Sequence, residues 1–176
     1  MSQAAVLSAT SVTARSARAN ALAERLERGA ESLAVLAASL SDAEWKTPIT
    51  HDGRTIGVVV HHVATMYPLE IELAQVLASG KPVVGVTMAN VHEINAVHAH
   101  QHAHVTKSEA LLLLQKNSTI AAAAVRALSD AELDRAALAS LYGNAPISCQ
   151  FMLEDHAVRH SYHHLAKIRE TLGLGE

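Results

Sequence analysis

The chain has 176 residues, of which 49% are hydrophobic and 18% charged, and its 14 basic and 17 acidic residues give a formal charge of −3. A chain of this length can bury a core of its own, and its charge lacks the basic excess that binding to a nucleic-acid backbone requires. The single cysteine, Cys149, excludes an internal disulfide and a multi-cysteine metal site. Any metal site must therefore use histidine or carboxylate ligands, and 12 histidines are present.

The N-terminal residues differ in composition from the rest. Residues 1–15 are mostly small and polar, without the apolar run of a secretory signal, and we expect a flexible tail there. We expect residues 16–176 to form a single domain. No stretch of about 18 apolar residues occurs, so we expect no membrane contact and a cytoplasmic location.

Apolar periodicity predicts four long helices. In chain order they cover about 17–40, 55–77, 88–128 with a pause near Val105, and 147–172. Capping-box sequences begin at Ser41, Thr106 and Ser129 and predict further helix starts there, while residues 142–146 predict a loop. With only 3% aromatic residues, the chain is predicted to be all-α, a four-helix bundle with short extra helices in the connections.

Two adjacent histidines on the second predicted helix have different surroundings. At about 100° per residue, His62 lies in the middle of an apolar stripe, whereas His61 points about 100° away, beside Glu72. The stripe comprises Val58, Val59, Met66, Leu69, Leu73, Val76 and Leu77. We therefore expect His62 to lie in the core. His61 is expected to be exposed to solvent, or to contact a metal ligand without binding the metal itself.

The last predicted helix carries a second inward-facing group. His160 and His164 share the side of Leu153, Ala157 and Ile168, whereas His156 and His163 fall among charged residues. Two histidines four residues apart lie one turn apart on one face, with Cβ atoms about 6 Å from each other, so both imidazoles can bind one metal ion.

A shared metal ion explains three buried histidines together. Each buried imidazole without a partner costs about 1 to 3 kcal/mol, and one ion would satisfy His62, His160 and His164 at once. Three histidine ligands leave at least one position for water or substrate, which is typical of catalytic rather than structural sites. The alternative is that each is an ordinary hydrogen-bonded core histidine.

The run His98-Ala-His100-Gln-His102-Ala-His104 is a rival group of ligands. On a helix, His98 and His102 share a face, and His100 and His104 point elsewhere. Three alternatives stay open: a polar helix end, a contribution of His98 or His102 to the same pocket, or a separate surface metal site. Asn95 lies one turn from His98 and could orient either histidine of the pair.

Two segments carry a resemblance to a known family. Thr55-Ile56-Gly57 with His62-Val63-Ala64, and His160-Ser161-Tyr162-His163-His164 on the last helix, resemble the DinB/YfiT-like superfamily of metalloenzymes over about residues 17–173. The resemblance implies a four-helix bundle holding a divalent ion, zinc or nickel among those found, through one residue of the second helix and two of the last.

Carried onto this chain, the metal ligands implied by the resemblance are His62, His160 and His164. Many relatives continue the final histidines with Arg-Gly-Gln, where this chain has residues 165–167 as Leu-Ala-Lys, and often have Glu where Val58 stands. The ligands are therefore retained, whereas the substrate is not carried over. Characterised relatives include thiol-dependent transferases and an isomerase that use low-molecular-weight thiols.

The resulting hypothesis is a metal-dependent transferase or hydrolase acting on a small molecule, with a low-molecular-weight thiol or water activated by the bound ion. His61, His163, Tyr67 and Glu154 are the candidate proton carriers. The alternative is a non-catalytic metal- or ligand-binding bundle with a structural, sensing or dimerisation role, for which the alanine face 121–124 would suit a homodimer contact. The metal's identity and the oligomeric state stay open.

Overall fold

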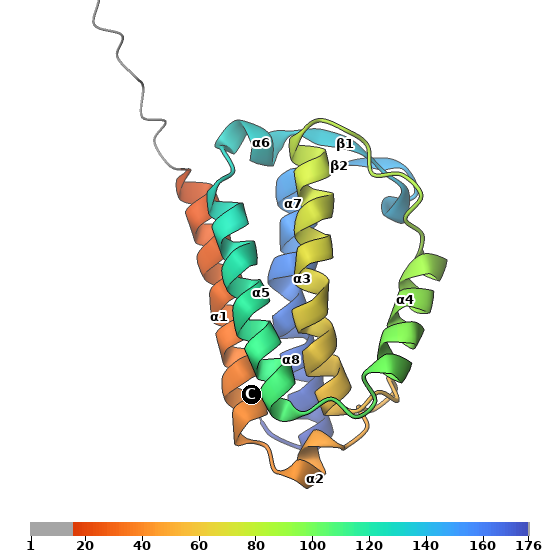
Figure 1. Ribbon diagram of the computed structural model, residues 1–176. Helices are drawn as coiled ribbons and strands as arrows, with labels where there is room; N and C mark the ends of the chain where they lie inside the picture. Colours follow the sequence, from red (N-terminus) through yellow and green to blue (C-terminus); the bar gives the residue numbers. More distant parts are fainter. Residues whose placement is uncertain (1–15, 176) are drawn as a thin grey trace, which may run out of the picture.

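Four long helical segments pack side by side in the computed structural model, which describes residues 16–175 (Figure 1). The bundle comprises α1 (Ala17–Ser39), α3 (Ile56–Ala78), α5 (Lys107–Arg126) and a final segment made of α7 (Cys149–Leu153), η2 (Glu154–Val158) and α8 (Arg159–Leu172). α5 contacts both α1 and α3, and α8 closes the bundle against the same two helices. The predicted bundle is confirmed, whereas the predicted tail, residues 1–15, lies outside the described residues.

The helix starts follow the capping residues. Side-chain and backbone hydrogen bonds form a capping box at Ser41, Thr106 and Ser129, which begin α2 (Asp42–Trp45), α5 and α6 (Asp130–Asp134). Each box satisfies backbone N–H groups that have no partner inside the helix. The predicted boundaries at these three places are confirmed.

A β-hairpin covers one end of the bundle, where helices and a loop were expected. Strand β1 (Ala136–Ala139) pairs antiparallel with β2 (Ala145–Ser148) around the short helix η1 (Ser140–Tyr142). Gly143 and Asn144, with φ of 64° and 61°, adopt the left-handed conformation that the turn needs. The predicted loop is correct for the turn, but the pairing of the two strands on either side of it was not predicted.

The start of α3 is fixed by a close contact. The indole of Trp45 packs on Gly57 so closely that a Cβ atom there would lie 2.4 Å from Nε1, and that nitrogen donates a hydrogen bond to Val105 O at 3.1 Å. Only glycine fits at this position. The contact sets the rotation of α3 one turn before His61 and His62.

α5 contributes its alanine face to the core. Ala121 and Ala122 are buried among the neighbouring helices, so half of the alanine face 121–124 is unavailable for the homodimer contact expected from sequence. Small side chains here let α5 approach α1 and α3 closely. Within the described residues, no helix is long and apolar enough to span a membrane.

α4 (Met88–Gln101) lies outside the four-helix bundle, next to α3 (Figure 1). His98 is the only buried residue of its 14. Three apolar side chains of this helix, Met88, Ile94 and Val97, are exposed. α4 is therefore docked chiefly through a polar side chain and not through an apolar face.

The last helical segment begins two residues later than predicted, because residues 145–148 form β2. It also contains a π-helical turn over residues 154–158, which ends just before His160. Such turns are often found at functional sites, since they alter the direction of the side chains around them. Cys149, at the start of the segment, is buried, and burial raises the pKa of its thiol to about 11.

Candidate metal centre

His62 of α3 meets His160 and His164 of α8 inside the protein. One ring nitrogen from each lies within 4.8 Å of the other two. The ring centroids are separated by 5.0 Å between His62 and His160, 5.7 Å between His62 and His164, and 4.9 Å between His160 and His164. The three histidines singled out by the sequence are thus brought together, and their binding of a metal stays a prediction.

Two of the three imidazoles of this first cluster, His62, His160 and His164, are held in the neutral form: those of His62 and His164. Burial and, after it, the charge of His160 lower the pKa of His62 and of His164 to about 2. His62 Nδ1 is buried and makes no hydrogen bond within the described part of the chain. Neutral imidazole nitrogens with an unpaired buried atom among them are a suitable ligand set for zinc or nickel.

A buried carboxylate supports the cluster. Glu70, two turns after His62 on α3, places Oε1 2.7 Å from Nδ1 of His160, at the distance of an ion pair. A carboxylate beside a metal-binding histidine orients the ring and increases its basicity. Glu70 was not predicted from the sequence, although its position two turns after His62, on the same face of α3, is a usable signal.

A pocket of about 350 Å³ opens above the first cluster, between α3, α4 and the last helical segment. Met66, Leu69 and Leu73, which belong to the predicted core stripe, form its apolar wall, and Leu69 is 39% exposed. That part of the stripe was wrongly assigned to the core. His62 is only 4% exposed and lies where the core meets the pocket.

An ion pair forms part of the polar wall. Arg54 donates to both carboxylate oxygens of Asp52, at 2.6 and 2.7 Å, and holds the pKa of that carboxyl below its usual value. The third guanidinium nitrogen, Nη1, is buried and makes no hydrogen bond to any described residue. Arg54 can therefore donate to an acceptor group in the pocket.

Only one of the four predicted proton carriers lines this pocket. The hydroxyl of Tyr67 is buried and hydrogen-bonded to Ser161 at 2.6 Å, and Glu154 pairs with Arg25 at 3.0 Å. His61 lies in a different cluster, which leaves His163, at the pocket wall. Burial lowers the pKa of His163, so its imidazole is neutral and able to accept a proton near pH 7.

His156, which the sequence pattern places among charged residues, is a further candidate proton carrier. His156 is half-buried, lines the pocket and lies 2.9 Å through Nε2 from the hydroxyl of Tyr142. Burial lowers its pKa. Its position depends on the π-helical turn, which the sequence pattern does not reveal.

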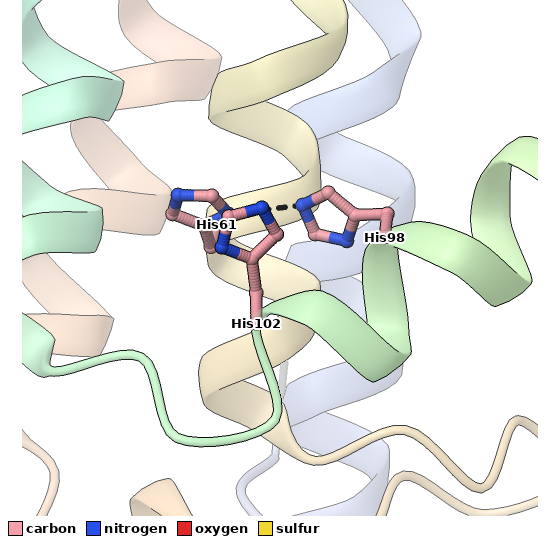
Figure 2. Close-up of side chains that lie close together, drawn as sticks. All are labelled: His61, His98 and His102. Atoms are coloured by element: carbon pink, nitrogen blue, oxygen red, sulfur yellow. Dashed lines mark hydrogen bonds between the residues drawn. The ribbon is translucent and has the colours of Figure 1, made fainter.

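His61 joins His98 and His102 in a second cluster, shown in Figure 2. His61 is only 8% exposed, so the expectation of a solvated side chain was wrong. The reason is that α4 covers this side of α3. His98 and His102 are grouped with His61, although the ring of His98 also lies 5.4 Å from that of His62, while His100 and His104 are exposed. No hydrogen bond links Asn95 to either histidine within the described chain, and Asn95 lines the first pocket.

Comparisons with known proteins agree with this architecture. A sequence profile of the DinB superfamily matches residues 25–168. Among solved structures, YfiT from Bacillus subtilis, described as a probable metal-dependent hydrolase with an unusual four-helix-bundle topology, is 21% identical, with 93% of each chain covered and a TM-score of 0.71. The mycothiol-dependent maleylpyruvate isomerase is 13% identical, with 85% of this chain and 60% of that chain covered and a TM-score of 0.66. No curated protein matches in sequence.

Proposed function

The chain belongs to the DinB superfamily, and on that basis we propose that it is a metal-dependent enzyme acting on a small molecule. His62, His160 and His164 would hold a divalent ion at the base of the pocket. The observation that carries the proposal is the meeting of these three buried imidazoles at a pocket wall. A closed structural site would need a fourth protein ligand, and among the described residues no fourth side chain is grouped with these three.

A divalent ion in this position lowers the pKa of a water molecule or thiol bound to it, and so supplies a nucleophile near neutral pH. The surrounding residues would supply the remaining functions. Glu70 fixes the ring of His160, Arg54 donates to an acceptor group of the substrate, and His163 accepts or returns a proton. The apolar wall limits the access of bulk water to the reacting groups.

Either water or a low-molecular-weight thiol suits the site as the nucleophile. YfiT, described as a probable metal-dependent hydrolase, supports the first choice, and the mycothiol-dependent isomerase supports the second. The cavity of about 350 Å³ has the size of a small-molecule site, and its lining includes Arg54, whose Nη1 makes no hydrogen bond to any described residue. We therefore propose a small substrate that carries a carboxylate or carbonyl oxygen.

The test is a turnover assay on metal-free protein and on protein reloaded with Zn²⁺ or Ni²⁺. Small carboxylic esters and amides test hydrolysis, and small electrophiles with cysteine-derived thiols test transfer. We expect turnover only with metal, loss of at least about 100-fold in His164→Ala, and unchanged turnover in His92→Ala, an exposed residue of α4. Turnover independent of metal, or absent with both panels, would contradict the enzyme proposal and leave a binding bundle.

A further inference from the structure

The second cluster consists of three imidazoles from two elements that are otherwise loosely joined. His61 comes from α3, and His98 and His102 come from the last turn and the C-terminal cap of α4. One ring nitrogen from each lies within 4.8 Å of the other two, and the ring centroids are 4.1 to 5.1 Å apart. This is the same kind of donor set as in the first cluster.

Hydrogen bonds within the described chain leave one ring nitrogen of this cluster without a partner. His61 Nδ1 lies 2.9 Å from His98 Nε2 (Figure 2), and the other nitrogen of His98, Nδ1, is buried without a hydrogen-bond partner in the described chain. Two histidine nitrogens bound to one tetrahedral zinc ion at about 2.0 to 2.1 Å are roughly 3.3 Å apart. Replacing the shared proton by an ion therefore requires only a small movement of the two rings.

The surroundings favour a cation that can exchange with solvent. A surface depression of about 600 Å³ is lined by His61, His102 and the carboxylate-bearing Glu109, which gives an ion a route of entry and leaves room for water ligands. The site also lies at the C-terminus of α4, where the free carbonyl groups give the helix a partial negative charge. Both features stabilise a divalent ion.

From this geometry we propose that His61, His98 and His102 form a second divalent-metal site, distinct from the first, which fastens α4 to the bundle. The chemical class is a transition-metal ion that prefers imidazole, such as Zn²⁺. The consequence for the pocket follows from the position of α4. His98 is its only buried residue, and Val91, Ile94 and Asn95 of the same helix form one wall of the pocket above the first cluster. Occupancy of the second site would hold that wall in place.

The test is metal binding by the full chain, measured as the number of Zn²⁺ equivalents retained after dialysis and by the visible spectrum with Co²⁺. We expect two equivalents in the natural protein, and one in His102→Ala, which contacts only the second cluster. His164→Ala should also keep one, and the matched control His100→Ala, exposed on the same helix as His98, should keep two. A circular dichroism spectrum and melting temperature of each variant check that it is folded.

A folded His102→Ala variant that retains as many equivalents as the natural protein would overturn the proposal. A second readout is independent of stoichiometry: amide hydrogen exchange over residues 88–101 should slow at least tenfold on adding Zn²⁺ to His164→Ala protein. No slowing in that experiment would overturn the fastening of α4. Neither result depends on turnover, so failure of the proposed enzyme function and failure of the second site are distinguishable.

Discussion

The two histidine clusters share one turn of α3 and differ in what surrounds them. His62 faces α8, a member of the bundle, and the buried carboxylate of Glu70 lies beside His160 of the same cluster. His61 faces α4, which lies outside the bundle and supplies two of the three imidazoles of its cluster. The first cluster is therefore built into the fold, whereas the second depends on the docking of one helix.

The difference shows how adjacent residues on a helix can serve separate sites. An offset of about 100° directs His61 toward α4 and His62 toward α8, although the ring of His62 also lies 5.4 Å from that of His98. The central position of α3, with bundle helices on one side and α4 on another, gives both residues a buried environment. The first cluster borders a pocket suited to a substrate, and the second borders an open depression suited to ion entry.

The largest expected effect is acid destabilisation of the metal-free protein through the first cluster. Burial lowers the pKa of His62 and His164 from about 6.5 to about 2, so the unfolded chain binds more protons, and stability is lost as the pH falls below about 6.5. With about 1.4 kcal/mol per pH unit for each group, the free energy of unfolding should fall by about 4 kcal/mol between pH 7 and pH 5. Urea unfolding of the protein at each pH, with a chelator present to keep it metal-free, measures this change in the free energy of unfolding.

A matched variant isolates the contribution of the first cluster to this pH dependence. His164→Gln should remove about half of the loss, because one of the two groups that cannot accept a proton in the folded state is gone. His100→Gln, an exposed residue near the second cluster, should leave the loss unchanged. An equal pH dependence in both variants would show that other groups control acid unfolding.

The next largest effect is expected when a metal ligand of the first cluster is removed, because the Zn²⁺ affinities of the two sites should then respond differently. His160→Ala is expected to weaken Zn²⁺ binding at the first site by more than about 100-fold and to leave binding at the second site unchanged. The loss should exceed that caused by removing a residue that only contacts a ligand. Calorimetric titration resolves the two events. His163→Ala, beside His164 but outside both clusters of ligands, is the control and should retain both affinities. Loss of both sites in His160→Ala would mean that they are one coupled site.

Glu70→Gln should have a smaller effect, confined to the first site. Loss of the carboxylate charge beside His160 Nδ1 should weaken metal binding there by about 10- to 100-fold, since ring basicity and orientation both decline. Glu72→Gln removes the same charge from an exposed position on α3 and should have no effect. Competition with a chromophoric chelator measures the Zn²⁺ affinity of both variants. Equal affinities would show that Glu70 does not contribute to the first site.

The smallest effect is expected at the second site. Burial lowers the pKa of His61, and the charge of nearby Glu109 partly opposes this shift, although Glu109 is exposed and already caps α5. Glu109→Gln retains a capping side chain and removes only the charge, so metal binding at the second site should weaken by no more than about fivefold. A loss above 100-fold would indicate that Glu109 is itself a ligand. The measurement is the same chelator competition.

The bundle and the first cluster could be predicted from the sequence because both depend on local periodicity. Leucine spacing, capping residues and the i, i+4 spacing of His160 and His164 are read within single helices. The placement of His62 on the same side of its helix as Met66 and Leu69 was correct. The assignment of that side to the core was not, because an apolar stripe looks the same when it lines a pocket.

The second cluster could not be predicted because it depends on contacts between distant segments. His61 points away from the apolar stripe, and its burial follows only from the packing of α4 outside the bundle, which periodicity does not specify. The π-helical turn at 154–158 likewise changes the direction of His156 in a way that a fixed 100° rotation misses. Pairing of 136–139 with 145–148 was hidden by the low β-propensity of alanine.

The central claim is that His61 and His62 belong to two separate metal sites. Anomalous diffraction from crystals of the protein grown with Zn²⁺ tests it most directly. The expected result is two peaks, one among His62, His160 and His164 and the other among His61, His98 and His102. A single peak shared by His61 and His62, or no peak at either cluster, would contradict it.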